Sequence, residues 1–151
     1  MSFYYAYCNY HTDDNLMAAY LFRKHTINFP NSKFNEECAY MGAFCYYNEA
    51  PIYSLDPTNT YKAIEELQSF VNRYQTSDKV DECNRLIDEL RANLSLKAFE
   101  NAKQYYTTSN YKSAIIALNN VLIDFPSFFN REEVHFLIVK STYLLAINSI
   151  S

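Results

Sequence analysis

Apolar residues recur at helical intervals along this chain, and one short pattern returns three times. An Ala is followed four residues later by a Phe or Leu, and twelve residues later by the position where a helix is expected to end. Ala6 and Ala102 stand twelve residues before the first and third of these alanines, so each pattern predicts two helices that pack through small residues. The three copies read Ala18, Phe22, Pro30; Ala63, Leu67, Gln75; and Ala114, Leu118, Pro126.

Paired helices at such a spacing are typical of the tetratricopeptide repeat. Each pair leaves one apolar face that must stack on a neighbouring pair, which produces a solenoid. We therefore expect an all-α, right-handed tetratricopeptide-repeat solenoid of about seven helices, forming a single domain over residues 1–151. The repeats are expected at about 1–30, 31–76 and 77–127, followed by an unpaired last helix at about 130–149.

Two departures from the regular spacing predict local features of these repeats. Ala43 precedes Ala63 by twenty residues instead of twelve, which predicts an inserted loop at about 48–56. Apolar residues in steps of three and four predict one long helix at about 78–107, and the next helix is expected at 111–124. The unpaired last helix and a first helix that begins within the pattern lead us to expect an excerpt of a longer protein.

Composition narrows the class of protein. One Gly, four Pro and 49% apolar residues argue against disorder and against an all-β fold. A net charge of -4 without a basic cluster argues against nucleic acid or an anionic membrane surface as partner. Polar residues interrupt the most apolar stretch, 134–150, so no membrane span is expected. The cysteines show no C-x-x-C spacing, and we expect them to be reduced and buried: Cys8, Cys38, Cys45 and Cys83.

The sequence offers no arrangement that points to catalysis. His11, His25 and His135 lack the spacing of metal ligands, and interhelical or surface positions are expected for them. Pairs such as Glu36-Glu37 fall near helix starts, where acidic residues complement the helix dipole. We expect no catalytic residue, no metal site and no cofactor, and a protein that is not an enzyme.

The candidate site is the groove that the first helix of each pair would line. Repeat positions five, nine and twelve face this groove, and eight of its nine residues are aromatic, which suits an extended, aromatic-ended segment. Lys103 is its one cation, which argues against a clamp for a peptide carboxylate. Alternatively, these rings pack between adjacent helices, as we expect for Tyr5, Tyr46 and Tyr105. The nine candidate residues are Phe3, Tyr7, Tyr10, Tyr40, Phe44, Tyr47, Phe99, Lys103 and Tyr106.

Three stretches of the chain resemble the BamD family of outer-membrane assembly lipoproteins. They are NFPNSKFNEECAYM at 28–41, SLDPTNTYKAIEELQ at 54–68 and FLIVKSTYLLAI at 136–147. The resemblance covers about residues 4–150 and corresponds to the middle of a family member, and the inserted loop and the long helix fit it. It implies a place at the periplasmic face of the outer membrane, with a lipid anchor on the parent protein that this chain does not carry.

The partners that the resemblance implies are proteins: the barrel-forming assembly subunit and unfolded outer-membrane protein clients. Two other functions stay open at this point. The chain could be a generic tetratricopeptide adaptor for an unrelated protein, or the helical repeat domain of an enzyme whose catalytic domain lies elsewhere. A lipoprotein signal encoded upstream would separate the first function from the second.

Overall fold

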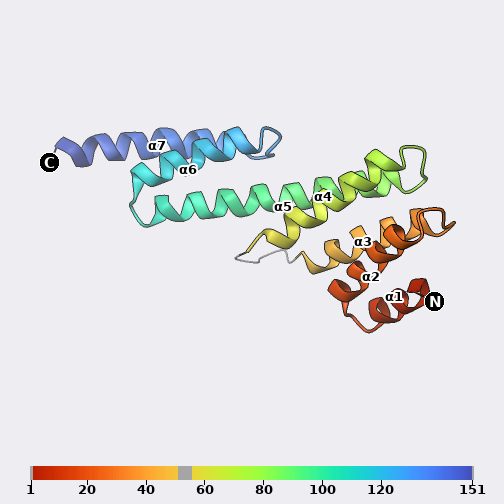
Figure 1. The fold of residues 1–151 in the computed structure, drawn as a ribbon. Coiled ribbons are helices and arrows are strands. Elements are labelled where there is room, and N and C mark those ends of the chain that lie inside the picture. Colours follow the sequence, from red (N-terminus) through yellow and green to blue (C-terminus); the bar gives the residue numbers. More distant parts are fainter. Residues whose placement is uncertain (1, 51–55, 151) are drawn as a thin grey trace. The chain divides into compact units, whose positions relative to one another are not determined.

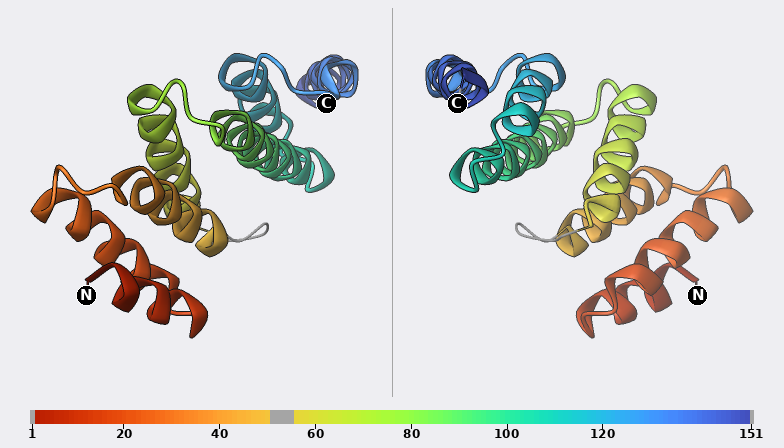
Figure 2. Two further views of the ribbon diagram at one scale, coloured as in Figure 1. Left: turned by 90° about the vertical axis from the view of Figure 1, so that its right-hand side faces the viewer. Right: turned by 90° about the vertical axis from the view of Figure 1, so that its left-hand side faces the viewer.

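The computed structural model describes residues 2–50 and 56–150, which form seven helices and no strand (Figure 1, Figure 2). The all-α prediction is therefore confirmed, while the handedness of the solenoid stays a prediction. The helices are α1 (Ser2–His11), α2 (Asn15–Asn28), α3 (Asn35–Glu49), α4 (Thr58–Arg73), α5 (Val80–Thr107), α6 (Tyr111–Asp124) and α7 (Arg131–Ile150).

The observed ends of the helices lie close to the predicted positions. α6 has the predicted bounds, and α5 ends at the predicted residue but begins at Val80 instead of 78. α3 continues through Asn48 and Glu49, two residues beyond the predicted end, so the start of the expected loop at 48–56 is helical. The rest of that loop lies mostly in residues 51–55, which are outside the described residues. At its end, the Asp56 carboxylate accepts the backbone N–H of Thr58, the first residue of α4, at 3.0 Å.

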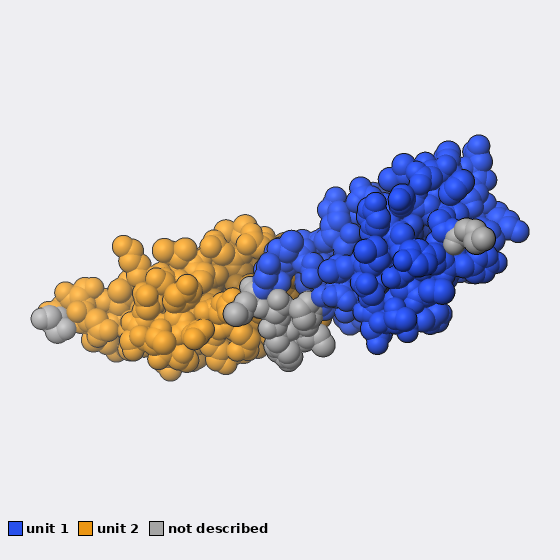
Figure 3. Space-filling model, turned by 60° about the horizontal axis from the view of Figure 1, so that its bottom comes forward, with its two compact units in different colours: residues 1–90 blue, residues 91–151 orange. Residues whose placement is uncertain are grey.

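The chain forms two compact units, residues 1–90 and residues 91–151 (Figure 3). α5 belongs to both, since its first turns lie in unit 1 and its remainder in unit 2. The single repeat domain over 1–151 stays a prediction.

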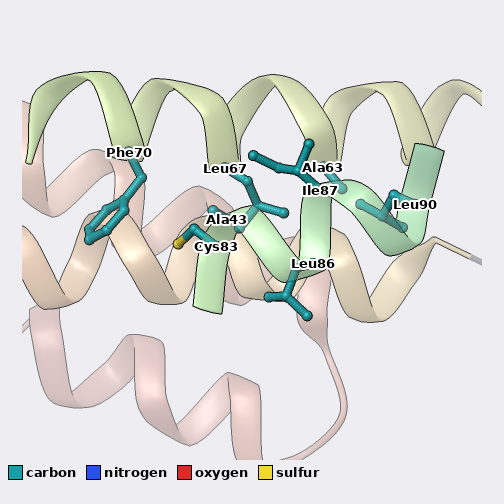
Figure 4. Close-up of a cluster of buried hydrophobic side chains, with 8 residues drawn as sticks. All are labelled: Ala43, Ala63, Leu67, Phe70, Cys83, Leu86, Ile87 and Leu90. Carbon is teal, nitrogen blue, oxygen red and sulfur yellow. The ribbon is translucent and has the colours of Figure 1, made fainter. Parts of the chain in front are cut away.

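Unit 1 has two clusters of buried side chains. In the first, α1, α2 and α3 pack through Ala6, Ala18, Phe22 and the buried cysteines of α3. In the second, α3, α4 and the first turns of α5 gather the side chains drawn in Figure 4. Ala18 and Ala63 have no exposed surface, as expected for small residues at contacts between paired helices. The members of the second cluster are Ala43, Ala63, Leu67, Phe70, Cys83, Leu86, Ile87 and Leu90.

Unit 2 repeats this arrangement with its own core. Ala102 of α5 and Ala114 of α6 are completely buried, as the repeated pattern predicts. Leu118 and Val121 complete the α6 face of the cluster, and α7 contributes Val134 and Leu137. The alanines that carry the repeated pattern are therefore all completely buried, which is what its physical interpretation requires: Ala6, Ala18, Ala63, Ala102 and Ala114.

The turns inside the first and third repeats share one backbone structure. Asp13 and Ser109 have positive φ values of 61° and 63°, and each stands two residues after the last residue of a first helix. The next N–H bonds back to the carbonyl five residues earlier, Asp14 to Asn9 and Asn110 to Tyr105. Together with bonds from Asp13 and Ser109 to the carbonyls three residues earlier, this is the Schellman arrangement that ends many helices.

Some buried positions were predicted wrongly. Cys8 is exposed, whereas Cys38, Cys45 and Cys83 are buried free thiols as expected. Tyr5 and Tyr105 were expected in the core but are 60% and 45% exposed. Neither ring packs against one of the three buried clusters, and the sequence pattern alone does not show this. None of the helices in the described ranges has both the length and the apolar character needed to cross a bilayer.

Candidate binding surface

The centre of the candidate surface is a row of three rings on α3. Tyr40, Phe44 and Tyr47 follow one another at intervals of four and three residues, which places them on one face of the helix. The ring centroids of Tyr40 and Phe44 are 5.9 Å apart with planes inclined by 17°, and those of Phe44 and Tyr47 are 5.7 Å apart at 24°. All three side chains are half-buried. The helix therefore presents a continuous strip of nearly parallel rings.

α1 adds one more half-buried ring to this strip. The Tyr10 centroid lies 6.5 Å from that of Phe44, so α1 and α3 meet at this point of the surface. We call Tyr10, Tyr40, Phe44 and Tyr47 the ring strip of unit 1. These four predicted groove residues form one continuous set of ring contacts in unit 1.

Tyr7 differs from the residues of the ring strip, because its ring packs against residues of the core. Its ring packs edge-on against Phe3 at 5.0 Å and against Phe22 at 5.1 Å. Its hydroxyl donates to the Glu37 carboxylate on α3. Burial, together with that negatively charged acceptor, raises the pKa of Tyr7 well above its usual value. Tyr7 thus fastens α1 to α3 beneath the surface.

Charged side chains from α5 and its preceding turn border the ring strip. The Tyr47 hydroxyl donates to Glu89 Oε1 at 2.7 Å, and this bond is the main reason that the pKa of Tyr47 is raised. Arg85 pairs with Glu82 at 2.7 Å and with Glu89 at 3.4 Å. Lys79 Nζ lies 4.5 Å from the centroid of the Tyr40 ring, within the range of a cation–π contact. These contacts hold the outer rings in fixed orientations.

Two predicted groove residues lie in the core. Phe3 is 8% exposed and stacks on Phe34, while Phe99 is 3% exposed and packs against Phe128 with centroids 5.3 Å apart. Their burial supports, at these two positions, the alternative that the rings pack between elements of the fold. Little of either ring is left for a ligand.

Unit 2 holds the last two predicted residues. Lys103 Nζ lies 3.4 Å from Glu133 Oε1 and 5.8 Å from the centroid of the Phe99 ring. Tyr106 is half-buried, with its centroid 5.9 Å from that of Tyr111. The Glu133 carboxylate partly neutralises the charge of Lys103. Unit 2 therefore contributes one half-buried ring, that of Tyr106, and a partly neutralised cation to the predicted groove.

Sequence reasoning missed the carboxylates that hold the tyrosines. Glu37 stands three residues before Tyr40, and this spacing on one helix could have placed it near the surface. Glu36, its neighbour, accepts a hydrogen bond from Ser77 before α5, so the pair connects α3 to two other segments. No spacing in the sequence indicated Glu89. This residue reaches Tyr47 because α5 packs on α3, and a spacing within one helix does not show that packing.

The histidines and acidic residues form no metal site in the described part of the chain. Among residues 2–50 and 56–150, no group of three His, Cys, Asp or Glu side chains could hold a metal ion. His25 is buried, and its Nδ1 and Nε2 lie 2.7 Å and 3.1 Å from the hydroxyls of Ser2 and Ser32. His25 is therefore an interhelical residue whose two ring nitrogens are both occupied.

The comparison with protein families decides the family. The sequence model of the YfiO family, described as an outer membrane lipoprotein, matches residues 2–150. The chain belongs to this family. A search of curated proteins found no match.

Membership of the YfiO family confirms the resemblance to BamD proteins that the three sequence stretches indicated. The family is associated with the outer membrane and with the assembly of its proteins, and it is a family of assembly lipoproteins rather than of enzymes. In this YfiO-family chain, the ring strip combines half-buried aromatic side chains from α1 and α3.

Proposed function

We propose that this chain is a protein-binding scaffold of outer-membrane protein assembly, and that the ring strip of unit 1 holds an extended segment of its partner. The partner is the barrel-forming assembly subunit or an unfolded outer-membrane protein client. In this proposal the protein acts at the periplasmic face of the outer membrane. The family gives the process, and the ring strip supplies the binding surface.

The spacing of the rings on α3 is the observation that carries the proposal. Side chains on one face of an extended strand recur every two residues, roughly 6.7 Å apart. The centroids of Tyr40, Phe44 and Tyr47 follow each other at 5.9 Å and 5.7 Å. Alternate side chains of an extended segment can therefore each lie against one ring. Strands of outer-membrane barrels alternate apolar and polar residues, which is the pattern such a surface would select.

The rings also lose little freedom when they bind. Tyrosine and phenylalanine have two side-chain torsions, and here each ring is already restrained by its neighbours. Tyr47 is hydrogen-bonded to Glu89, and Tyr40 lies under Lys79. A surface that is ordered before binding avoids part of the entropy cost of association.

A defined peptide tests the proposal. The probe is a fluorescein-labelled nine-residue peptide that alternates Val or Tyr with Thr and ends in Phe, and binding is followed by fluorescence anisotropy. Phe44→Ala and Tyr47→Ala should each weaken binding at least tenfold, equivalent to about 1.4 kcal/mol. Tyr61→Ala is the matched control, because Tyr61 is a 56% exposed ring on α4 outside the ring strip.

Three results would contradict the proposal: unchanged affinity in both ring variants, an equal loss in Tyr61→Ala, or equal affinity for a scrambled peptide whose apolar residues are contiguous. Circular dichroism of each variant shows whether the helices are intact. Competition by the purified barrel-forming subunit would then identify which of the two partner classes shares the surface.

A further inference from the structure

The Tyr47 end of the ring strip carries more negative than positive charge. Two carboxylates of α5, those of Glu82 and Glu89, stand beside it with one guanidinium, that of Arg85. Arg85 Nε and Nη2 donate to the two oxygens of Glu82 at 3.0 Å and 2.7 Å, whereas Nη1 lies 3.4 Å from Glu89 Oε2. The guanidinium therefore interacts mainly with Glu82, and one carboxylate charge remains beside the Tyr47 ring.

Glu89 can accept a further hydrogen bond. Its Oε1 accepts the Tyr47 hydroxyl at 2.7 Å, and its Oε2 is reached by Arg85 only at the longer distance. A carboxylate can accept about four hydrogen bonds. The Glu89 side chain is 42% exposed, so a donor of a partner can approach it from solvent.

Tyr40, at the other end of the row of rings on α3, shows how such a ring binds a cation. Lys79 Nζ lies 4.5 Å from its centroid, well inside the limit of about 6 Å for a cation–π contact. Tyr47 is a half-buried tyrosine on the same face of the helix. Among the cation–π contacts of the described residues, none involves Phe44 or Tyr47. No cation of the described chain thus takes at Tyr47 the place that Lys79 takes at Tyr40.

An arginine side chain matches both the ring and the carboxylate. Its planar guanidinium stacks on aromatic faces and donates to carboxylates in a fixed fork. An acidic side chain in the same place would meet the like charges of Glu82 and Glu89, which repel it. Charge therefore separates segments that the rings alone would accept equally.

We infer that the extended segment held by the ring strip carries a basic residue, whose side chain lies on the Tyr47 ring and pairs with Glu89. The apolar side chains of the segment lie against the other rings of the strip. This inference rests on the proposed function and adds to it the charge of the partner segment, which the spacing of the rings leaves open. Glu89 is then the residue that selects among apolar, extended segments.

Capped nine-residue peptides test the inference on the full chain by isothermal titration calorimetry. They alternate Val or Tyr with Thr, and either the first or the last residue is Arg, citrulline or Glu, so that both directions of the segment are covered. Citrulline has the shape of arginine without its charge. At one of the two positions, Arg should give a Kd at least fivefold lower than citrulline, and Glu a higher Kd than citrulline. Equal Kd values for Arg and citrulline at both positions would overturn the inference.

Two variants that each remove one carboxylate charge locate the preference. Glu89→Gln keeps an oxygen that can accept the Tyr47 hydroxyl but loses the charge, so the citrulline-to-Arg ratio of Kd values should fall below twofold. Asp88→Asn is the matched control, because Asp88 is the adjacent exposed carboxylate of α5 and forms no ion pair among the described residues. Its ratio should stay at fivefold or more. An unchanged ratio in Glu89→Gln, or an equal decrease in Asp88→Asn, would refute the role of Glu89.

The citrulline peptide separates this inference from the proposed function. If it binds and Phe44→Ala weakens its binding, the ring strip holds extended segments whatever their charge. Equal affinities for the Arg and citrulline peptides would then reject the basic residue alone. Failure of every peptide to bind would reject both.

Discussion

Phe3 lies face to face with Phe34, with ring centroids 4.4 Å apart and planes inclined by 18°. Phe34 immediately precedes α3, so the connection between two repeats places a ring over the first groove position of the repeat before it. Phe99 is likewise in contact with Phe128, which lies in the connection between α6 and α7, although these two rings are inclined by 42° with centroids 5.3 Å apart. The two connections therefore bury a ring that the repeat position alone would assign to the groove.

In the second repeat, a lysine takes the place of the covering phenylalanine. Lys79 precedes α5, and its ammonium lies 4.5 Å from the centroid of the Tyr40 ring. A lysine side chain keeps its charged end in water and covers a ring only in part. Tyr40 accordingly remains half-buried and belongs to the ring strip. Position five is thus buried in the two repeats where a phenylalanine of the connection packs against it, and half-buried in the repeat where a lysine does.

The first prediction concerns the covering ring of unit 2. Phe128 is 4% exposed, and Phe128→Ala should lower the free energy of unfolding by about 3 kcal/mol, because it leaves a cavity beside Phe99. Phe129→Ala is the matched control, since this adjacent ring is 79% exposed and its loss should change stability by less than about 0.5 kcal/mol. Urea unfolding followed by circular dichroism measures both. Equal effects of the two substitutions would show that Phe128 does not seal the core.

The second prediction concerns the turn before α6. Ser109 has a φ of 63°, a conformation that side chains with a Cβ adopt at a cost and glycine adopts freely. Ser109→Gly should therefore raise the free energy of unfolding by about 0.5 to 1 kcal/mol. Ser69→Gly, at an exposed position inside α4, should lower it by a similar amount. Thermal melting of the two variants compares them directly, and a loss of stability in Ser109→Gly would contradict the interpretation of the turn.

The sequence predicted the helices better than the surface, for a physical reason. Helix positions depend on local signals, such as the spacing of Ala114 and Leu118 or the proline that follows α6, and these are visible in one chain segment. The exposure of a ring depends on residues brought to it from elsewhere. Phe3 and Phe99 were assigned to the groove because their repeat position is correct, yet the residues that cover them stand in connections whose paths the pattern does not specify.

The third prediction concerns a polar residue in the core of unit 2. Ser141 of α7 is completely buried, and its hydroxyl has no hydrogen-bond partner among the described residues. A buried hydroxyl without a partner destabilises the fold, so Ser141→Ala should raise the free energy of unfolding by about 1 kcal/mol. Ser149→Ala on the same helix should have little effect, because Ser149 is exposed. A decrease in stability of Ser141→Ala in urea titrations would show that the hydroxyl has a favourable contact in solution.

The fourth prediction separates the four thiols by their accessibility. Cys8 is exposed, and Cys38, Cys45 and Cys83 are buried. A thiol reagent such as 5,5′-dithiobis(2-nitrobenzoate) should therefore modify one thiol rapidly and the other three only as fast as the protein opens. Cys8→Ser should remove the rapid phase and leave the slow phase unchanged. Rapid modification of a second thiol would show that unit 1 opens locally around α3, if it is Cys38 or Cys45, or around the first turns of α5, if it is Cys83.

The fifth prediction follows from the same burial and concerns alkaline pH. Burial, with a smaller contribution from Glu49, raises the pKa of Cys45 to about 12, and burial with the charge of Glu82 raises that of Cys83 to about 11. In the unfolded chain these thiols ionise near 9, so their contribution to stability is complete below that pH and is lost as the pH rises toward the folded values. The free energy of unfolding should therefore fall above pH 9. Cys45→Ala removes one of the titrating groups, so its stability should decline less steeply between pH 9 and 12 than that of the unaltered chain, even though it starts from a lower value. Urea titrations at half-unit intervals measure both slopes, and parallel curves would show that Cys45 is not protected from ionisation in the folded state.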